Sequence, residues 1–139
     1  MTVEHVDPPE IAPPVQGIYS HVAIGRGAAV AAIAGQIALD ADGNLVGPGD
    51  HGAQAEQAFR NFQNALAAIG CGPADLLKYT VHVVGHGPEL VEPIFAAGRR
   101  VFGAGWPRTA STLLGVQALG EPEWLIEIDG LAVIPSDSD

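Results

Sequence analysis

The clearest pattern of hydrophobic and polar positions lies near the end of the chain, in residues 125–134. Strict alternation over these residues predicts a β-strand with two distinct faces. One face carries only apolar or small residues: Ile126, Ile128, Gly130, Ala132 and Ile134. The other carries Leu125, Glu127, Asp129, Leu131 and Val133. The first face should therefore lie on the core.

Two carboxylates, Glu127 and Asp129, stand on a strand face that is otherwise apolar. Burying a carboxylate is unfavourable unless it is paired or used in a functional site. The alternative is a strand whose second face meets water. The alternation alone leaves both interpretations open.

The same analysis predicts the other elements. Residues 107–135 are expected to form two adjacent strands joined by a short connection at residues 120–122, and Arg26-Gly27 offers a hairpin turn between two earlier strands. The remaining predictions are strands at 17–24, 28–36 and 76–84 and helices at 51–69 and 88–102. This order favours an α+β sandwich in which two helices cover one face of a mixed sheet.

The opposite sheet face would then be uncovered within one chain. We expect it to carry Leu113, Leu125, Leu131 and Val133. Hydrophobic residues make up 47% of the chain, and the mean hydropathy is +0.23, which is high for a small monomer. Both observations favour self-association through this face.

The chain of 139 residues is long enough for one domain with a real core. We expect an extended N-terminal arm at 1–16, the domain at 17–135 and an acidic tail at 136–139. The start of the chain lacks the basic and apolar segments of a signal peptide, and a single cysteine excludes disulfides within the chain, so we expect a cytoplasmic protein. The net charge of -10 argues against nucleic acid and anionic membranes as partners.

Candidate chemistry is sparse. His82 and His86 would lie about 13 Å apart on a strand, too far for one metal ion, so neither a metal nor another cofactor is expected. Trp106 and Arg108 precede the last strand pair, where they could clamp a planar anion. Such a pair more often only packs its loop.

Five segments in order resemble the Rid family (reactive intermediate deaminases, or YjgF-like proteins). They are Gly17-Ile18-Tyr19-Ser20, Ile33-Ala34-Gly35-Gln36 with the turn at 40–43, the helix around 62–70, Ala74-Asp75-Leu76-Leu77-Lys78, and Ile126-Glu127-Ile128-Asp129. The resemblance covers nearly the whole chain, residues 17–134. It implies a chorismate-mutase-like subunit, a homotrimer and three ligand clefts at the subunit interfaces.

The resemblance also implies site residues. Tyr19, Gly35 and Glu127 match the tyrosine, the strand backbone and the glutamate that the family uses in those clefts. Deaminating members add an arginine that grips the substrate carboxylate while a held water attacks the imine carbon. Here Ser111 occupies that position, and Leu113 stands where many members carry a small polar residue or cysteine. Arg108 lies three residues earlier, an odd shift that places it on the opposite strand face unless the backbone bends.

Two functions follow from the resemblance. One is an enzyme that hydrolyses or tautomerises a small imine, enamine or related carbonyl compound. The other is a non-catalytic trimer that binds a metabolite or a partner protein in the same clefts. Ribonuclease activity, attributed to some relatives, conflicts with the net charge of -10.

Overall fold

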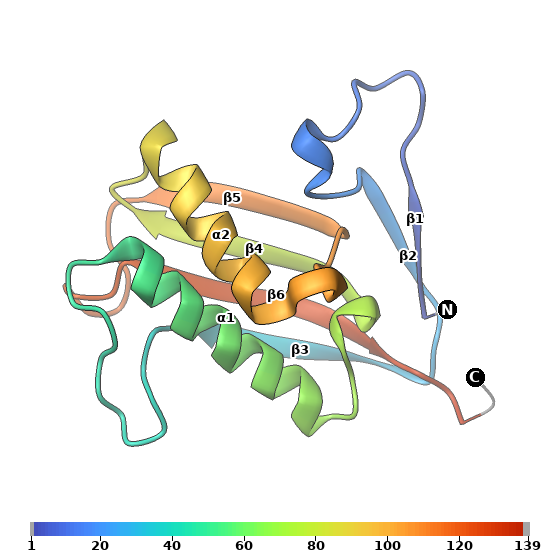
Figure 1. The fold of residues 1–139 in the computed structure, drawn as a ribbon. Coiled ribbons are helices and arrows are strands. Elements are labelled where there is room, and N and C mark those ends of the chain that lie inside the picture. Colours follow the sequence, from blue (N-terminus) through green and yellow to red (C-terminus); the bar gives the residue numbers. More distant parts are fainter. Residues whose placement is uncertain (1, 138–139) are drawn as a thin grey trace.

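The computed structural model describes residues 2–137, so the predicted tail at 136–139 lies partly outside the described residues. Within these residues the chain forms two α-helices, six strands and four short 3-10 turns (Figure 1). The strands are β1 (Val3–Val6), β2 (Val22–Gly25), β3 (Ala29–Gln36), β4 (Leu76–Val84), β5 (Ala110–Val116) and β6 (Ile126–Ile134). The helices are α1 (His51–Ala68) and α2 (Val91–Phe102). The 3-10 turns are η1 (Val15–Gly17), η2 (Pro73–Asp75), η3 (Pro88–Leu90) and η4 (Gly103–Gly105).

The main sheet has four strands in the order β3-β6-β4-β5. β4 pairs with β5 in parallel, and the other two pairings are antiparallel. The mixed sheet is therefore confirmed, but the expected adjacency of the last two strands is wrong. β4 lies between β5 and β6, because the whole segment 117–125 connects them rather than a three-residue turn.

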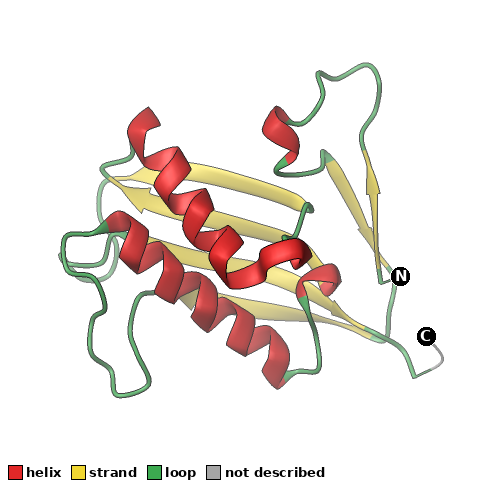
Figure 2. Ribbon diagram, viewed as in Figure 1, coloured by secondary structure: helices red, strands yellow, loops and turns green. Residues whose placement is uncertain are grey.

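Both helices cover one face of this sheet, as predicted (Figure 2). The predicted inner face of β6 is confirmed, since Ile126, Ile128 and Ala132 are fully buried against α1 and its neighbours. On α1 the residues spaced at three and four, Ala55, Phe59, Phe62 and Leu66, are buried in the same cluster. The predicted last member of that helix face, Ile69, lies beyond the helix and is 37% exposed.

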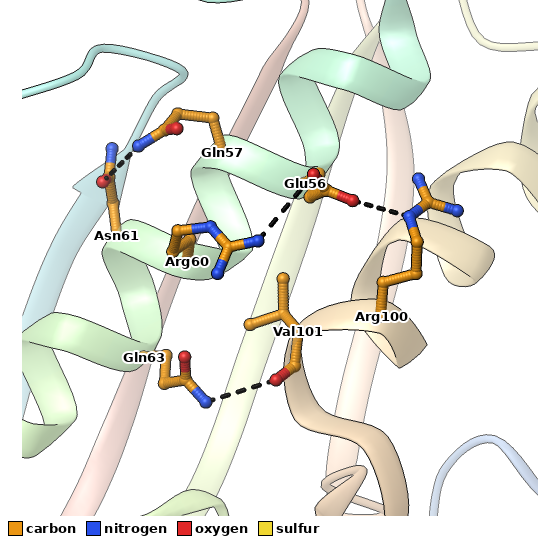
Figure 3. Close-up of polar contacts among 7 residues, drawn as sticks. All are labelled: Glu56, Gln57, Arg60, Asn61, Gln63, Arg100 and Val101. Atoms are coloured by element: carbon orange, nitrogen blue, oxygen red, sulfur yellow. Dashed lines mark hydrogen bonds and ion pairs between the residues drawn. The ribbon is translucent and has the colours of Figure 1, made fainter.

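Polar side chains join the two helices on their outer side (Figure 3). Glu56 of α1 accepts a hydrogen bond from Nε of Arg100 at 2.6 Å and lies 3.8 Å from an Arg60 nitrogen. Gln63 donates to the carbonyl of Val101 at 3.4 Å. The arginines are about half exposed, so these contacts orient the helices more than they stabilise them.

The N-terminal segment forms a separate two-stranded sheet, in which β1 pairs with β2. Figure 1 shows this sheet beside the end of the main one. The expected hairpin between the strands on either side of Arg26-Gly27 is therefore wrong, because β2 pairs with β1 and β3 pairs with β6. Contacts to the main domain hold the N-terminal segment: the Ser20 backbone N–H donates to the Thr109 carbonyl at 3.2 Å, and Thr2 donates to Asp75.

The sheet face opposite the helices, called here the open face, differs in composition from the expectation. Leu113 and Leu125 pack against the core, and Val133 is buried where β2 approaches β6. Its exposed apolar residues are Val30 (65%), Leu114 (38%) and Leu131 (38%). An uncovered apolar face exists, but only Leu131 of the four expected residues is exposed on it. No helix within residues 2–137 is both long enough and apolar enough to cross a membrane.

Candidate functional site

Glu127 lies on the open face of β6, between the buried residues Ile126 and Ile128. Its neighbour on β3 is Gly35: a Cβ atom added there would lie 2.6 Å from the Glu127 carboxyl carbon. No side chain fits at that distance, so glycine provides the space that the carboxylate occupies. The structure thus brings together two of the residues that the sequence selected, Gly35 and Glu127.

His82 of β4 joins this group, although its sequence position suggested nothing beyond a rejected metal site. It lies opposite Glu127 in the strand register, and its Nδ1 is 3.0 Å from the Glu127 carbonyl oxygen. Its Nε2 is 3.9 Å from an Asp129 carboxylate oxygen. The signal that could have found it is the alternation of Lys78, Thr80 and His82 with the buried residues of β4.

Ser111 and Leu113 lie on the other sheet face, toward the helices. In the parallel register Ser111 faces Tyr79 and Leu113 faces Val81, both buried in the core. Ser111 and Leu113, together with Tyr19, line a pocket of about 210 Å³, called here the α2–β5 pocket. Its other lining residues are apolar: Val15, Ile18, Val91 and Phe95.

The Tyr79 hydroxyl is buried beside this pocket and has no hydrogen-bond partner of standard geometry among residues 2–137. Burial raises the pKa of Tyr79 to about 12, and the Ser111 side chain beside it acts in the opposite direction, too weakly to reverse the shift. Tyr79 therefore stays a neutral phenol with an unused donor.

Trp106 packs against aromatic residues of the core and also lines one hollow together with Arg108. Its ring lies in edge contact with Phe59, Phe95, Phe102 and Tyr79, at centroid distances of 5.7 to 6.5 Å. Its indole N–H donates to the Ile18 carbonyl at 2.9 Å, which fixes the loop before the α2–β5 pocket. These contacts pack the loop, and the clamp with Arg108 stays a prediction.

Arg108 lines a second hollow, of about 340 Å³, with His5 and Thr109 among its neighbours. A guanidinium nitrogen lies 3.0 Å from where a Cβ atom on Gly17 would be. Ser111 does not line this hollow, and Arg108 does not line the α2–β5 pocket. Ser111 belongs to β5, whereas Arg108 lies in the loop before that strand begins at Ala110, so the two side chains have different surroundings.

Five of the selected residues therefore form two groups on opposite faces of one sheet, whereas Trp106 and Arg108 line a separate hollow. Gly35 and Glu127 lie on the open face, whereas Tyr19, Ser111 and Leu113 line a pocket on the helix side. Within residues 2–137 no group of three or more His, Cys, Asp or Glu residues is arranged to hold a metal ion.

Comparisons with known proteins agree on one family. The family model described as Endoribonuclease L-PSP matches residues 10–134. A solved Yersinia pestis structure, YyfB, described as a Rid family protein of unknown function, is 35% identical with a TM-score of 0.87, over 96% of this chain and 99% of that one. YyfA of the same organism, also described as a Rid protein, is 23% identical over 95% and 99% of the two chains, with a TM-score of 0.66.

A Thermotoga maritima structure described as a candidate endoribonuclease is 26% identical, with a TM-score of 0.64, and the match covers 94% and 97% of the two chains. No curated protein matches the chain. These solved structures are therefore similar to the chain in fold, but their descriptions give different activities or none.

Proposed function

Because the chain belongs to the Rid family, we propose that it is a small-molecule enzyme acting on an imine- or enamine-type intermediate. The reaction is hydrolysis or tautomerisation in a cleft between subunits of a homotrimer. No metal or other cofactor takes part in the proposed reaction.

The separation of the two residue groups is the observation that carries this proposal. Glu127 and the α2–β5 pocket lie on opposite faces of the sheet, so one chain cannot bring them to one substrate. A second copy packed against the open face would bring its own α2–β5 pocket toward Glu127. Val30 and Leu131 are exposed apolar residues on that face, so covering them with a second copy would be favourable.

Glu127 performs the proton transfers in this proposal. For an imine, it accepts a proton from a water molecule as the water oxygen bonds to the imine carbon, and it returns the proton to nitrogen. The carbinolamine then loses ammonia and leaves a carbonyl compound, so imine plus water gives carbonyl plus ammonia. Gly35 leaves room for the carboxylate, and Tyr19 of the neighbouring copy orients the substrate.

A second candidate function is a trimer that binds a metabolite or a partner protein without turnover. Ser111 favours it, because this serine occupies the position at which deaminating relatives carry their substrate-binding arginine. The two functions differ in the role of Glu127. Turnover requires its carboxylate to transfer protons, whereas binding without turnover uses Glu127 only as a contact to the ligand.

The test is ammonia release from a panel of neutral imines and enamines and from 2-imino acids, all generated in situ. We expect turnover of at least one neutral substrate by the wild type and its loss in Glu127→Gln. Glu92→Gln is the matched control, because Glu92 is 76% exposed on α2 and forms an ion pair with Arg99 at the helix surface. Turnover that survives in Glu127→Gln would contradict the mechanism, and no turnover of any substrate would favour the binding protein.

Mixing two inactive variants tests the shared cleft separately. Glu127→Gln and Tyr19→Ala lose different groups, so a mixed trimer contains clefts in which both groups are intact. We expect activity to return after the two variants are unfolded and refolded together, but not after each is refolded alone. Failure to recover activity would contradict a cleft built from two chains.

A further inference from the structure

The α2–β5 pocket is uncharged. Apart from Ser111 and the Tyr19 phenol, its lining is aliphatic or aromatic, and Arg108 lies outside it. A carboxylate placed here would lose its water without gaining a cation, which is strongly unfavourable. The pocket therefore suits an uncharged, apolar group.

A buried polar group, the Tyr79 hydroxyl, lies behind this apolar lining. The residue is 1% exposed, and its hydroxyl is an unsatisfied donor next to Ser111. Leaving a buried hydroxyl unpaired lowers stability, so such a group calls for an explanation. Phenylalanine would fill the same space against Trp106 without this penalty, so packing does not require the oxygen.

The strand register connects the two hydroxyls to the pocket. Tyr79 and Ser111 are direct partners on the parallel strands β4 and β5, and Ser111 alone of the two lines the pocket. A hydroxyl accepts one hydrogen bond while donating another. Ser111 can therefore accept from Tyr79 and donate into the pocket.

We propose that the α2–β5 pocket binds the apolar substituent of a neutral substrate and that Tyr79 and Ser111 donate in series to one carbonyl oxygen on it. This inference rests on the proposed function and names its substrate class: an imine or enamine whose second polar group is an amide, ester or ketone instead of a carboxylate. Tyr79 acts through Ser111, so it is a positioning residue.

Three probes of similar size separate the contributions: benzamide, benzoate and toluene. Binding is measured by NMR titration of the Leu113 and Val91 methyl groups, which line the pocket, with wild type, Ser111→Ala, Tyr79→Phe and Thr112→Ala. Thr112→Ala is the matched control, because Thr112 is the next residue of β5 and lies on the open face.

We expect benzamide to bind at least tenfold more tightly than benzoate. Ser111→Ala and Tyr79→Phe should each weaken benzamide binding about two- to tenfold and leave toluene unchanged, since one hydrogen bond is lost. Thr112→Ala should change neither. Benzoate binding as tightly as benzamide, equal losses for benzamide and toluene, or no methyl shift with any probe would overturn the inference.

The same titration with Glu127→Gln separates this inference from the proposed function. If Glu127→Gln binds benzamide as wild type does, and wild type turns over no substrate, the pocket assignment stands and the enzymatic proposal fails. If Glu127-dependent turnover is found but benzamide shows no preference over benzoate, the enzyme stands and this inference fails.

Discussion

The Glu127 carboxylate occupies the space that a side chain at Gly35 would fill: a Cβ atom on Gly35 would lie 2.6 Å from the carboxyl carbon of Glu127. The contact joins two strands, β3 and β6, beside an irregularity in their register between Ile33 and Gln36. The position of Glu127 on the open face thus depends on the absence of a side chain at residue 35.

Gly35→Ala should therefore displace the Glu127 carboxylate. Moving a catalytic group by about 1 Å can reduce turnover by about 10²-fold, so we expect a loss approaching that of Glu127→Gln. Gly72→Ala is the control, because a Cβ there meets nothing within 4 Å and its φ of -124° suits alanine. Turnover and melting temperature of both variants are measured. Unchanged turnover in Gly35→Ala would mean that Glu127 works from another position.

Tyr79 predicts a defined dependence of stability on pH. Its pKa rises from an ordinary value of 10 to about 12 in the folded chain, so the folded state holds the proton more tightly. Between pH 10 and 12 the unfolded chain loses this proton first, and the free energy of unfolding falls by about 1.4 kcal/mol per pH unit. Below pH 10 the group adds no slope.

Urea unfolding of wild type and Tyr79→Phe at several pH values isolates this contribution, because other groups titrate alike in both. We expect the variant to lack the added slope and, near pH 7, to be as stable as wild type or about 1 kcal/mol more stable, since an unpaired hydroxyl is removed. Parallel curves above pH 10 would contradict the assignment.

The core face of a strand was predictable from this sequence where the residues on the two faces of that strand differ in polarity. The isoleucines of β6 alternate with carboxylates, so its core face was assigned correctly. In β5, Thr112, Leu113 and Leu114 give no alternation, and Leu113 was placed on the wrong face. β3 is rich in alanine on both faces and gives equally little information.

Strand neighbours and the division of the site were not predictable by the same means. Alternation says which residues share a face but not which strand lies alongside, so the insertion of β4 between β5 and β6 left no local signal. The register of β5 on β4 then decides that Ser111 lies over Tyr79, on the face opposite Glu127. That relation between distant residues exists only in the folded chain.

The homotrimer remains a prediction, and Leu131 offers a direct test of it. Leu131 is exposed on the open face, and Leu131→Glu would bury a charge in any interface formed there. Obligate interfaces bury on the order of 2,000 Å² and hold subunits together, so we expect wild type to sediment as a trimer. We expect the variant to sediment as a monomer. Asn64→Glu adds the same charge at an exposed position of α1 and should remain trimeric. A wild type that is monomeric at every concentration would contradict the shared cleft.

RNA should not bind measurably at physiological salt, despite the description of the matching family model. The chain has six basic residues, and four of them are already paired with its own glutamates: Arg26, Arg60, Arg99 and Arg100. Among residues 2–137 the two remaining basic residues, Lys78 and Arg108, have no carboxylate partner, and Lys78 donates to the Thr112 hydroxyl. Too few charges remain to contact phosphates against a net charge of -10. Fluorescence polarisation with labelled single-stranded RNA checks this, and salt-sensitive binding would prove it wrong.

Ser111 should make the protein a poor catalyst for 2-imino acids. A bidentate contact between arginine and a carboxylate is worth roughly 1.5–3 kcal/mol, or about 10- to 150-fold in rate, and a serine hydroxyl offers only one neutral donor. We expect little acceleration by wild type and a gain of activity in Ser111→Arg, whose guanidinium would enter the α2–β5 pocket. Asn64→Arg is the control, because it adds the same charge at an exposed position of α1, outside both the pocket and the open face, and it should remain inactive. Arg108→Ala should leave the low wild-type rate unchanged, since Arg108 lines a different hollow. Efficient hydrolysis by wild type that disappears in Arg108→Ala would show that this arginine reaches the substrate after all.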